Sequence, residues 1–338
     1  MMRFLALLSL FAALLFGETT LKIAEYNVQN LFDLHYDGSE YKEYIPNSSS
    51  NWNKRTYNIK LKHIARVIKD LDADIVALEE VENLHSLKDL RKTLQRMGVY
   101  YRYYAIADAK ATTVKVAVLS KIPFVYKKEI WVSHTKEYRN ILELKYKVGH
   151  ESFYLFVNHW KSKSGAESRR IVSAKALKQR IEQIGYDKNI IITGDFNSDF
   201  EEYIKFRRRY KLNDTHGKTG INHILNTIKV TTPAKEAHLL PKELYNLWYD
   251  LPREEQWNYI HRRNKETLDS IIISKPVLER GGFDYIYGSF GVLKKPYLFY
   301  KKRYINRWYI RYSHNGARHM GKGYSDHLPI FAKFVVSE

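Results

Sequence analysis

The sequence predicts one α/β domain in which mostly antiparallel sheets lie under helices. Three observations support this prediction. Short apolar runs alternate with amphipathic stretches along the chain, no linker interrupts them, and 338 residues with 44% hydrophobic side chains can build one large core. The chain contains no internal repeat and no low-complexity tract, so solenoid and disordered architectures are disfavoured.

The first element along the chain is a predicted targeting segment. Met1-Met2-Arg3 carries one positive charge, an apolar run follows from Phe4 to Phe16, and polar residues begin after Gly17. This run is shorter than the roughly 20 residues of a transmembrane helix and suits a signal peptide. We predict a signal peptide over residues 1–17, export to the periplasm or the medium, and no stable membrane insertion. A buried N-terminal helix or a membrane anchor is the alternative.

Residues 18–338 are predicted to form a single domain. Helical spacing of apolar residues, such as Ile64, Val67, Ile68 and Leu71, predicts helices over 56–71, 84–96 and 167–184. Short apolar runs with polar ends predict strands over 21–26, 75–78, 114–119, 142–148, 153–157, 189–193, 268–273 and 330–336. Two long irregular regions, at about 215–265 and 283–322, are predicted to be insertions on the same core.

Charge and cysteine content narrow the function. Lys and Arg number 56 against 37 Asp and Glu, a formal excess of +19, which falls to +18 once Arg3 is removed with the signal peptide. Such an excess favours a polyanionic partner, such as nucleic acid, a phosphorylated surface or anionic lipid. Cysteine is absent, which excludes disulfides, thiolate-bound zinc and a thiol nucleophile.

Polar clusters stand at the ends of five apolar strands, where ligand sites often gather. They are Asn27, Glu79-Glu80, Asn158-His159, Gly194-Asp195-Phe196-Asn197 and Ser325-Asp326-His327. Each cluster alone is often a turn, a cap or a solvated helix start, but these alternatives do not explain all five together. Carboxylate and amide oxygens suit Mg²⁺ or Mn²⁺, histidines transfer protons near neutral pH, and Mg²⁺ commonly takes further ligands from a substrate phosphate. This combination predicts phosphoester hydrolysis.

In their order along the chain these motifs resemble those of the endonuclease/exonuclease/phosphatase superfamily. The resemblance rests on Tyr26-Asn27, Glu79-Glu80, Asn158-His159, Gly194-Asp195-Phe196-Asn197, Leu268-Asp269-Ser270-Ile271 and Ser325-Asp326-His327, and it spans residues 21–336. It implies a deoxyribonuclease I-like, four-layer αββα sandwich of two mostly antiparallel sheets flanked by helices.

The resemblance also implies a metal site and a substrate-phosphate site. Glu80 is the implied principal ligand, with Asn27 and Asp326 beside the ion, which is expected to be Mg²⁺ or Mn²⁺. One ion or two are both compatible with the motifs, and Ca²⁺ stays a third option. Arg139 matches an arginine that contacts the substrate phosphate, although a surface ion pair is the alternative for this residue.

Five further residues carry the implied catalytic roles. Asp195 would orient or deprotonate the attacking water, and Asn197 would contact the scissile phosphate. His327 would pair with Asp269, which sets its tautomer, and His159 would donate to a phosphate oxygen. The resemblance does not decide which of the two histidines is the acid and which the base.

Segment 283–318 bears on the choice of substrate because it mixes cations with many tyrosines. Basic residues interleaved with aromatics suit a nucleic-acid backbone with stackable bases. An ordinary basic hairpin that packs its tyrosines on the core is the alternative. The candidates for nucleic-acid contact are Lys301, Lys302, Arg303, Arg307 and Arg311.

Together these features predict an exported, metal-dependent nuclease that cleaves DNA, or also RNA, with little sequence specificity. A phosphodiesterase or phosphatase acting on a lipid or a small phosphorylated molecule is the first alternative. A catalytically dead, basic nucleic-acid-binding protein is the second, and the intact motifs disfavour it. The sequence does not decide between endo- and exonucleolytic action and does not indicate an oligomer.

Overall fold

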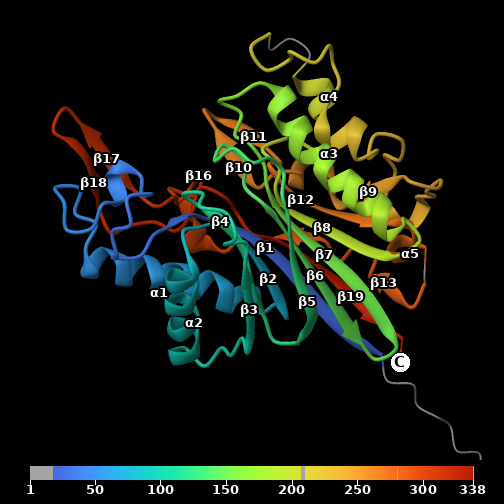
Figure 1. Ribbon diagram of the computed structural model, residues 1–338, viewed down its shortest axis with the longest axis horizontal. Coiled ribbons are helices and arrows are strands. Elements are labelled where there is room, and N and C mark those ends of the chain that lie inside the picture. The colour runs from blue at the N-terminus through green and yellow to red at the C-terminus, as the bar shows by residue number, and fades with distance from the viewer. Residues whose placement is uncertain (1–17, 207–209, 280, 338) are drawn as a thin grey trace, which may run out of the picture.

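The computed structural model describes residues 18–206, 210–279 and 281–337, and it shows two large sheets between helices (Figure 1). The predicted signal peptide, residues 1–17, lies outside the described residues. Within these described ranges, no helix has the length and apolar character needed to cross a membrane.

The first large sheet has seven strands and contains the N-terminal and C-terminal strands side by side. β1 and β2 run parallel, and the other neighbours are antiparallel. In spatial order the strands are β13 (Phe283–Tyr285), β19 (Ile330–Val336), β1 (Thr19–Leu31), β2 (Ile75–Val81), β4 (Lys115–Ser120) and β3 (Tyr103–Ile106), with β14 (Gly291–Val292) also paired to β19.

The second large sheet has six strands, of which only β7 and β8 are parallel neighbours. In spatial order they are β5 (Phe124–Ile130), β6 (Ile141–Val148), β7 (Glu151–His159), β8 (Asn189–Asp195), β12 (Asp269–Ser274) and β9 (Leu244–Asn246). Both sheets are therefore mostly antiparallel.

The two sheets pack face to face, and helices cover their outer faces. Ile23 and Ile75 of the first sheet share one buried cluster with Ile191 of the second, whereas their neighbours Ala24 and Val76 face a separate cluster. This alternation is the two-residue period of a strand buried on both faces. Burying one such isoleucine contributes about 1.5–3 kcal/mol.

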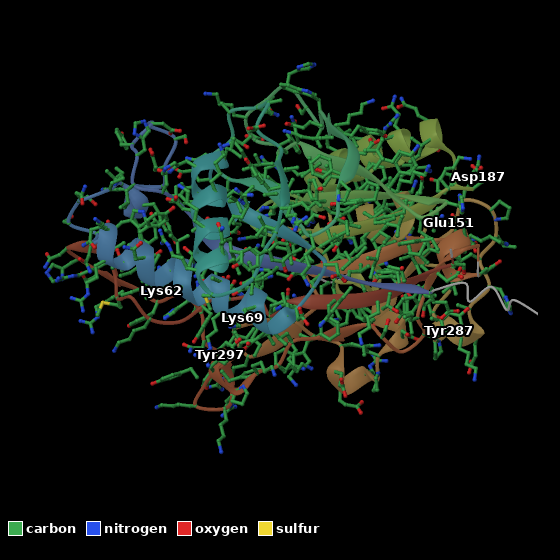
Figure 2. All side chains as sticks on the ribbon, turned by 90° about the horizontal axis from the view of Figure 1, so that it is seen from below. Lys62, Lys69, Glu151, Asp187, Tyr287 and Tyr297 are labelled. Carbon is green, nitrogen blue, oxygen red and sulfur yellow. The ribbon has the colours of Figure 1, made fainter. Side chains whose placement is uncertain are left out.

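Three long helices form the outer layers. α1 (Lys54–Leu71) and α2 (Leu84–Arg96) pack on the first sheet, and α3 (Glu167–Ile184) packs on the second (Figure 1). These helices and sheets form the predicted αββα layers, so the predicted fold class is confirmed. Figure 2 shows Lys62 and Lys69 along α1 and, at the opposite end of the molecule, Glu151 and Asp187.

Local signals set the helix ends. The Asn53 side chain caps α1 and forms a reciprocal capping box with Thr56, which accounts for a start two residues before the predicted one. α3 ends at Gly185, whose φ of 95° is accessible to glycine. The observed bounds of α2 and α3 coincide with the predicted ones.

The irregular regions at 215–265 and 283–322 supply sheet edges as well as excursions. β9, β13 and β14 from these regions pair with core strands. The remaining pieces are three small hairpins and several short helices. They are β10 (Tyr259–His261) with β11 (Asn264–Glu266), β15 (Phe299–Tyr300) with β16 (Tyr304–Ile305), β17 (Ile310–Ser313) with β18 (Gly316–His319), the π-helix η2 (Gly220–Ile224), and the 3₁₀ helices η3 (Ala234–Glu236), η4 (Leu247–Asp250), η5 (Arg253–Glu255) and η6 (Pro296–Leu298). Outside these two regions, the described residues form three further short helices, the 3₁₀ helix η1 (Lys42–Tyr44), α4 (Glu202–Lys205) and α5 (Lys275–Leu278).

The hairpin β17–β18 projects from the body beside the chain around η1 (Figure 1), and His319 anchors it there. The indole N–H of Trp308 donates to His319 Nδ1 at 2.9 Å, so Nε2 carries the proton that is donated to the Glu43 carbonyl at 2.9 Å. This pattern requires a neutral imidazole. Burial lowers the pKa of His319 from 6.5 to about 4.

Acid is therefore expected to weaken this anchor. Because the folded-state pKa lies below the unfolded value, the contribution of His319 to stability is complete above about pH 6.5 and is lost towards about pH 4. The loss amounts to at most about 3 kcal/mol. Urea unfolding of wild type and His319→Gln at several pH values should show the difference between the two proteins narrowing over this window. A difference in unfolding free energy that stays constant with pH would contradict a neutral His319 side chain in the folded protein.

Candidate active site

Three predicted residues lie side by side across one end of the second sheet. Asp195, the last residue of β8, is in register with His159 of β7 on one side and with Asp269 of β12 on the other. Neighbouring strands are about 4.8 Å apart, so the register places all three side chains within reach of one phosphate group.

Asn27 and Glu80 reach the same place from the first sheet. Asn27 Nδ2 donates to Glu80 Oε1 at 3.3 Å and to Asp195 Oδ2 at 3.1 Å, which joins the two sheets at the site. Glu80 has a φ of 64°, and the β1–β2 register shifts beyond Asn27. The adjacent Glu79 is fully buried, whereas the Glu80 side chain is 21% exposed. The structure thus directs Glu80 into the site and Glu79 into the interior.

Glu80, His159 and Asp195 together form a cluster that could hold a metal ion, with their ligand atoms all within 4.8 Å of one another. Burial, followed by the charge of Asp326, raises the pKa of Glu80. Burial, followed by the charge of Asp269, raises the pKa of Asp195 to about 7. Carboxylates that are buried together repel unless a proton or a cation neutralises them, so this donor set fits a divalent ion.

The His327 side chain is held by Asp269 of β12 and Tyr259 of β10. Its Nδ1 lies 2.8 Å from Asp269 Oδ2, and the Asn258 amide also donates to that carboxylate. The ring of Tyr259 packs against the imidazole with centroids 4.7 Å apart. Burial alone would lower the pKa of His327, but the charges of Asp269, Asp195 and Asp326 raise it well above its ordinary value. The imidazolium form is therefore favoured, with Nε2 left to donate.

His159 has the opposite electrostatic environment. Its Nε2 lies 3.6 Å from Asp195 Oδ2 and 3.9 Å from Glu80 Oε1. Burial, with the positive charges of Arg139 and His327, lowers its pKa well below the ordinary value. The pKa values of the two histidines are thus shifted in opposite directions, as in sites where one group acts as acid and another as base.

The loop after β7 positions the remaining predicted residues. The Trp160 carbonyl accepts from Asn197 Nδ2 at 3.2 Å and from Arg139 Nη1 at 3.4 Å. The Asn197 backbone N–H also donates to Asp195 Oδ1 at 2.8 Å. Arg139 and Asn197 are therefore tied to one carbonyl beside His159.

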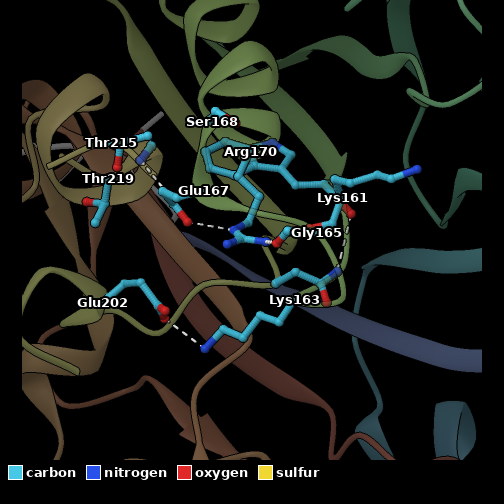
Figure 3. Close-up of polar contacts among 12 residues, drawn as sticks. Lys161, Lys163, Gly165, Glu167, Ser168, Arg170, Glu202, Thr215 and Thr219 are labelled. Atoms are coloured by element: carbon cyan, nitrogen blue, oxygen red, sulfur yellow. Dashed lines mark hydrogen bonds and ion pairs between the residues drawn. The ribbon is translucent and has the colours of Figure 1, made fainter. Parts of the chain in front are cut away.

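A buried polar network holds this loop (Figure 3). Arg170 donates to the carbonyls of Lys161, Ser162 and Gly165 at 3.1–3.3 Å, and its Nε lies 2.7 Å from Glu167 Oε2. Lys163 Nζ lies 2.7 Å from Glu202 Oε2, which joins the loop to α4.

The predicted nucleic-acid contacts are distributed over two hairpins. Arg307 Nη2 lies 3.6 Å from Asp326 Oδ2, so the structure brings Arg307 to the rim of the site. Lys301 and Lys302 form the turn of β15–β16, with Arg303 beside them, and Arg311 lies on β17, opposite Arg318. The five cations therefore do not form one cluster.

Asn258, Tyr259 and Glu25 contribute to the site and were not predicted from the sequence. The first two lie in an irregular region, and no motif distinguishes them. Glu25 is a charged residue inside an apolar strand, a signal that sequence reasoning could have used. Burial raises the pKa of both Glu25 and Glu79 well above its ordinary value.

Comparison with known proteins identifies the family of the chain. A model of the Endonuclease/Exonuclease/phosphatase family matches residues 22–335, whereas no curated protein matches the chain. TDP2 from D. rerio, complexed with a single-strand DNA product, superimposes with a TM-score of 0.56 at 14% identity, over 94% of this chain and 99% of that one.

Two proteins from Bacteroides thetaiotaomicron also share the fold. One is an endonuclease/exonuclease/phosphatase family protein, with a TM-score of 0.55 and 17% identity over 95% of this chain and 100% of that one. The other is a mannosyl-6-phosphatase, with a TM-score of 0.53 and 18% identity over 93% of this chain and 99% of that one. Since the family model covers nearly the whole described chain, the protein belongs to the endonuclease/exonuclease/phosphatase family.

Proposed function

We propose that this chain is an exported, metal-dependent nuclease that hydrolyses phosphodiester bonds of DNA, or also of RNA, with little sequence preference. Family membership supports hydrolysis of phosphate esters. The observation that carries the narrower proposal is the position of Arg307 at Asp326, because it joins the acidic site to hairpins rich in cations and exposed tyrosines. Phosphate contacts of this kind bind nucleic acid without reading its sequence.

The reaction follows from the positions of the side chains. Asp195 orients the attacking water and accepts its proton, the water oxygen forms a bond to phosphorus, and the bond to the leaving oxygen breaks, after which that oxygen takes up a proton from solvent. His327, oriented by Asp269, donates to a phosphoryl oxygen, while His159 and Asn197 contact the other oxygens. Glu80, Asn27 and Asp326 would hold a Mg²⁺ or Mn²⁺ ion, which would supply further neutralisation of the charge on the phosphate.

A direct assay tests the proposal. Protein lacking residues 1–17 is incubated with supercoiled plasmid, RNA, sphingomyelin vesicles or a sugar phosphate, each with Mg²⁺, Mn²⁺ or EDTA. We expect the loss of supercoiled plasmid with either metal and none with EDTA. Turnover of lipid or sugar phosphate alone, or binding of DNA without cleavage, would overturn the proposal. Secretion of the full-length chain by a bacterial host, with cleavage near residue 17, tests export.

Cleavage is expected to be salt-sensitive, because bound cations release counterions from the phosphate backbone. Raising NaCl from about 50 to about 200 mM should lower kcat/KM on duplex DNA by at least about tenfold. A small phosphodiester such as bis(p-nitrophenyl) phosphate serves as the control, since it has no counterion atmosphere. Equal salt dependence for the two substrates would mean that the net charge of the chain does not act on DNA.

A further inference from the structure

A pocket of about 610 Å³ lies beside the candidate active site and combines aromatic rings with positive charge. We call it the cationic pocket. Its principal lining residues are Trp257, Phe299, Lys265, Lys294, Lys302 and Arg303. They come from the region before β10, from β11, from the chain after β14 and from the β15–β16 hairpin, so only the folded chain brings them together.

Two ammonium groups share the Trp257 ring. Lys265 Nζ lies 4.5 Å and Lys294 Nζ lies 4.8 Å from the ring centroid. Lys294 is partly buried and also donates to the Glu255 carbonyl at 3.4 Å. Burial lowers the pKa of Lys294, and the charge of Glu255 raises it. The charge of Lys265 lowers it, as expected for two ammonium groups that repel each other.

The pocket cations form no direct ion pairs with the carboxylates that the structure describes. Over the ranges that the structure describes, Lys265, Lys294, Lys302 and Arg303 make no ion pair with a carboxylate. Elsewhere in the protein, lysines such as Lys121 and Lys163 do have carboxylate partners. Four cations around one cavity, none of them in an ion pair within the described ranges and only Lys294 influenced by a nearby carboxylate, create a positive potential that an anionic ligand would neutralise.

The pocket adjoins the active site through a single stretch of chain. Trp257 is followed by Asn258, whose amide contacts Asp269, and then by Tyr259, whose ring packs on His327. Consecutive Cα atoms are about 3.8 Å apart, so the pocket begins within a few residues of the reacting centre. A ligand extending from the site can therefore reach it.

The far wall of the pocket is anchored to α1. Tyr297, in η6, donates from its hydroxyl to Asp70 Oδ2 at 2.7 Å, and the Arg66 guanidinium lies 4.0 Å from the centre of its ring. Figure 2 shows Tyr297 and Lys69 on the same side of the molecule. These contacts fix the chain next to Pro296, which lines the pocket.

We propose that the cationic pocket binds a backbone phosphate of the nucleic-acid strand next to the scissile phosphate, with the sugar or base of that nucleotide against Trp257 and Phe299. This proposal rests on the proposed nuclease function and adds a second contact point on its substrate. Ammonium groups satisfy phosphate oxygens, and aromatic rings accept any base, so the contact adds affinity without sequence preference.

The test compares two double variants that remove the same charge. Lys265→Ala/Lys294→Ala removes the ammonium pair, and Lys128→Ala/Lys147→Ala removes two exposed lysines from β5 and β6. Each protein is assayed on a 20-nucleotide strand and on bis(p-nitrophenyl) phosphate, after thermal unfolding has established that both variants are folded. We expect the pocket variant to raise KM for the strand about tenfold or more with little change in kcat, and the control to behave as wild type.

The salt dependence provides a second readout. Loss of a phosphate contact should reduce the slope of log affinity against log salt by about 0.7 or more for single-stranded DNA. The proposed phosphate contact would be rejected if the two double variants changed KM for the strand equally. It would also be rejected if the pocket variant lost as much activity on the small diester as on the strand. Measuring oligonucleotide binding by each double variant in a His327→Ala background separates the pocket proposal from the nuclease proposal. A higher Kd in the pocket variant alone supports the phosphate contact even if no polynucleotide is cleaved. An unchanged Kd in the pocket variant rejects it.

Discussion

Replacing His327 by alanine is expected to lower the rate of phosphodiester hydrolysis by about a thousandfold. The imidazole is held by Asp269 at Nδ1 and by the Tyr259 ring, so its Nε2 is preorganised to donate to a phosphoryl oxygen. Positioned proton donors contribute about 10²–10⁴-fold to such reactions. Initial rates on plasmid DNA at saturating metal measure the effect, and the fold should remain intact because His327 lies at the end of its sheet.

Asp269→Asn is the matched variant, since it keeps the shape of the residue and removes the charge that orients and ionises His327. The double variant His327→Ala/Asp269→Asn is expected to be no slower than His327→Ala alone, because residues that act as one unit are not additive. Asp195→Ala and His159→Ala should also lower turnover by orders of magnitude. Near-wild-type rates in the His327 and Asp195 variants would reject this site.

Replacing Arg170 by methionine is expected to lower the free energy of unfolding by about 3–5 kcal/mol. Arg170 and Glu167 are both fully buried, and the substitution leaves the Glu167 carboxylate without its cation. It also removes the donor to the carbonyls of Lys161, Ser162 and Gly165. Urea unfolding monitored by tryptophan fluorescence measures the loss.

Lys188→Met is the control for charge loss, because the Lys188–Asp187 pair is exposed and such pairs contribute little to stability. The double variant Glu167→Gln/Arg170→Met should recover part of the stability lost in Arg170→Met, since it no longer buries an uncompensated charge. If Arg170→Met and Lys188→Met were equally stable, the network in Figure 3 would not hold the loop after β7.

The local pattern of residues predicted most elements of the fold. The bounds of α2, α3 and β19 agree with the structure because their apolar spacing and end signals lie within a few residues of one another. β5 was not predicted, since an edge strand carries charges such as Lys127 and Lys128 in place of an apolar run. β3 was also missed, as a four-residue strand holds too little pattern.

The sequence by itself determined the fold class and identified polar strand ends as the candidate site, because each motif is local and its order along the chain can be read directly. Only the tertiary structure decided that Asn27 joins Glu80 to Asp195 across two sheets, that Asn258 and Tyr259 support the His327–Asp269 pair, and that four cations from distant segments line one pocket with Trp257. These contacts depend on strand register and sheet packing, which are set by interactions between residues far apart in the chain.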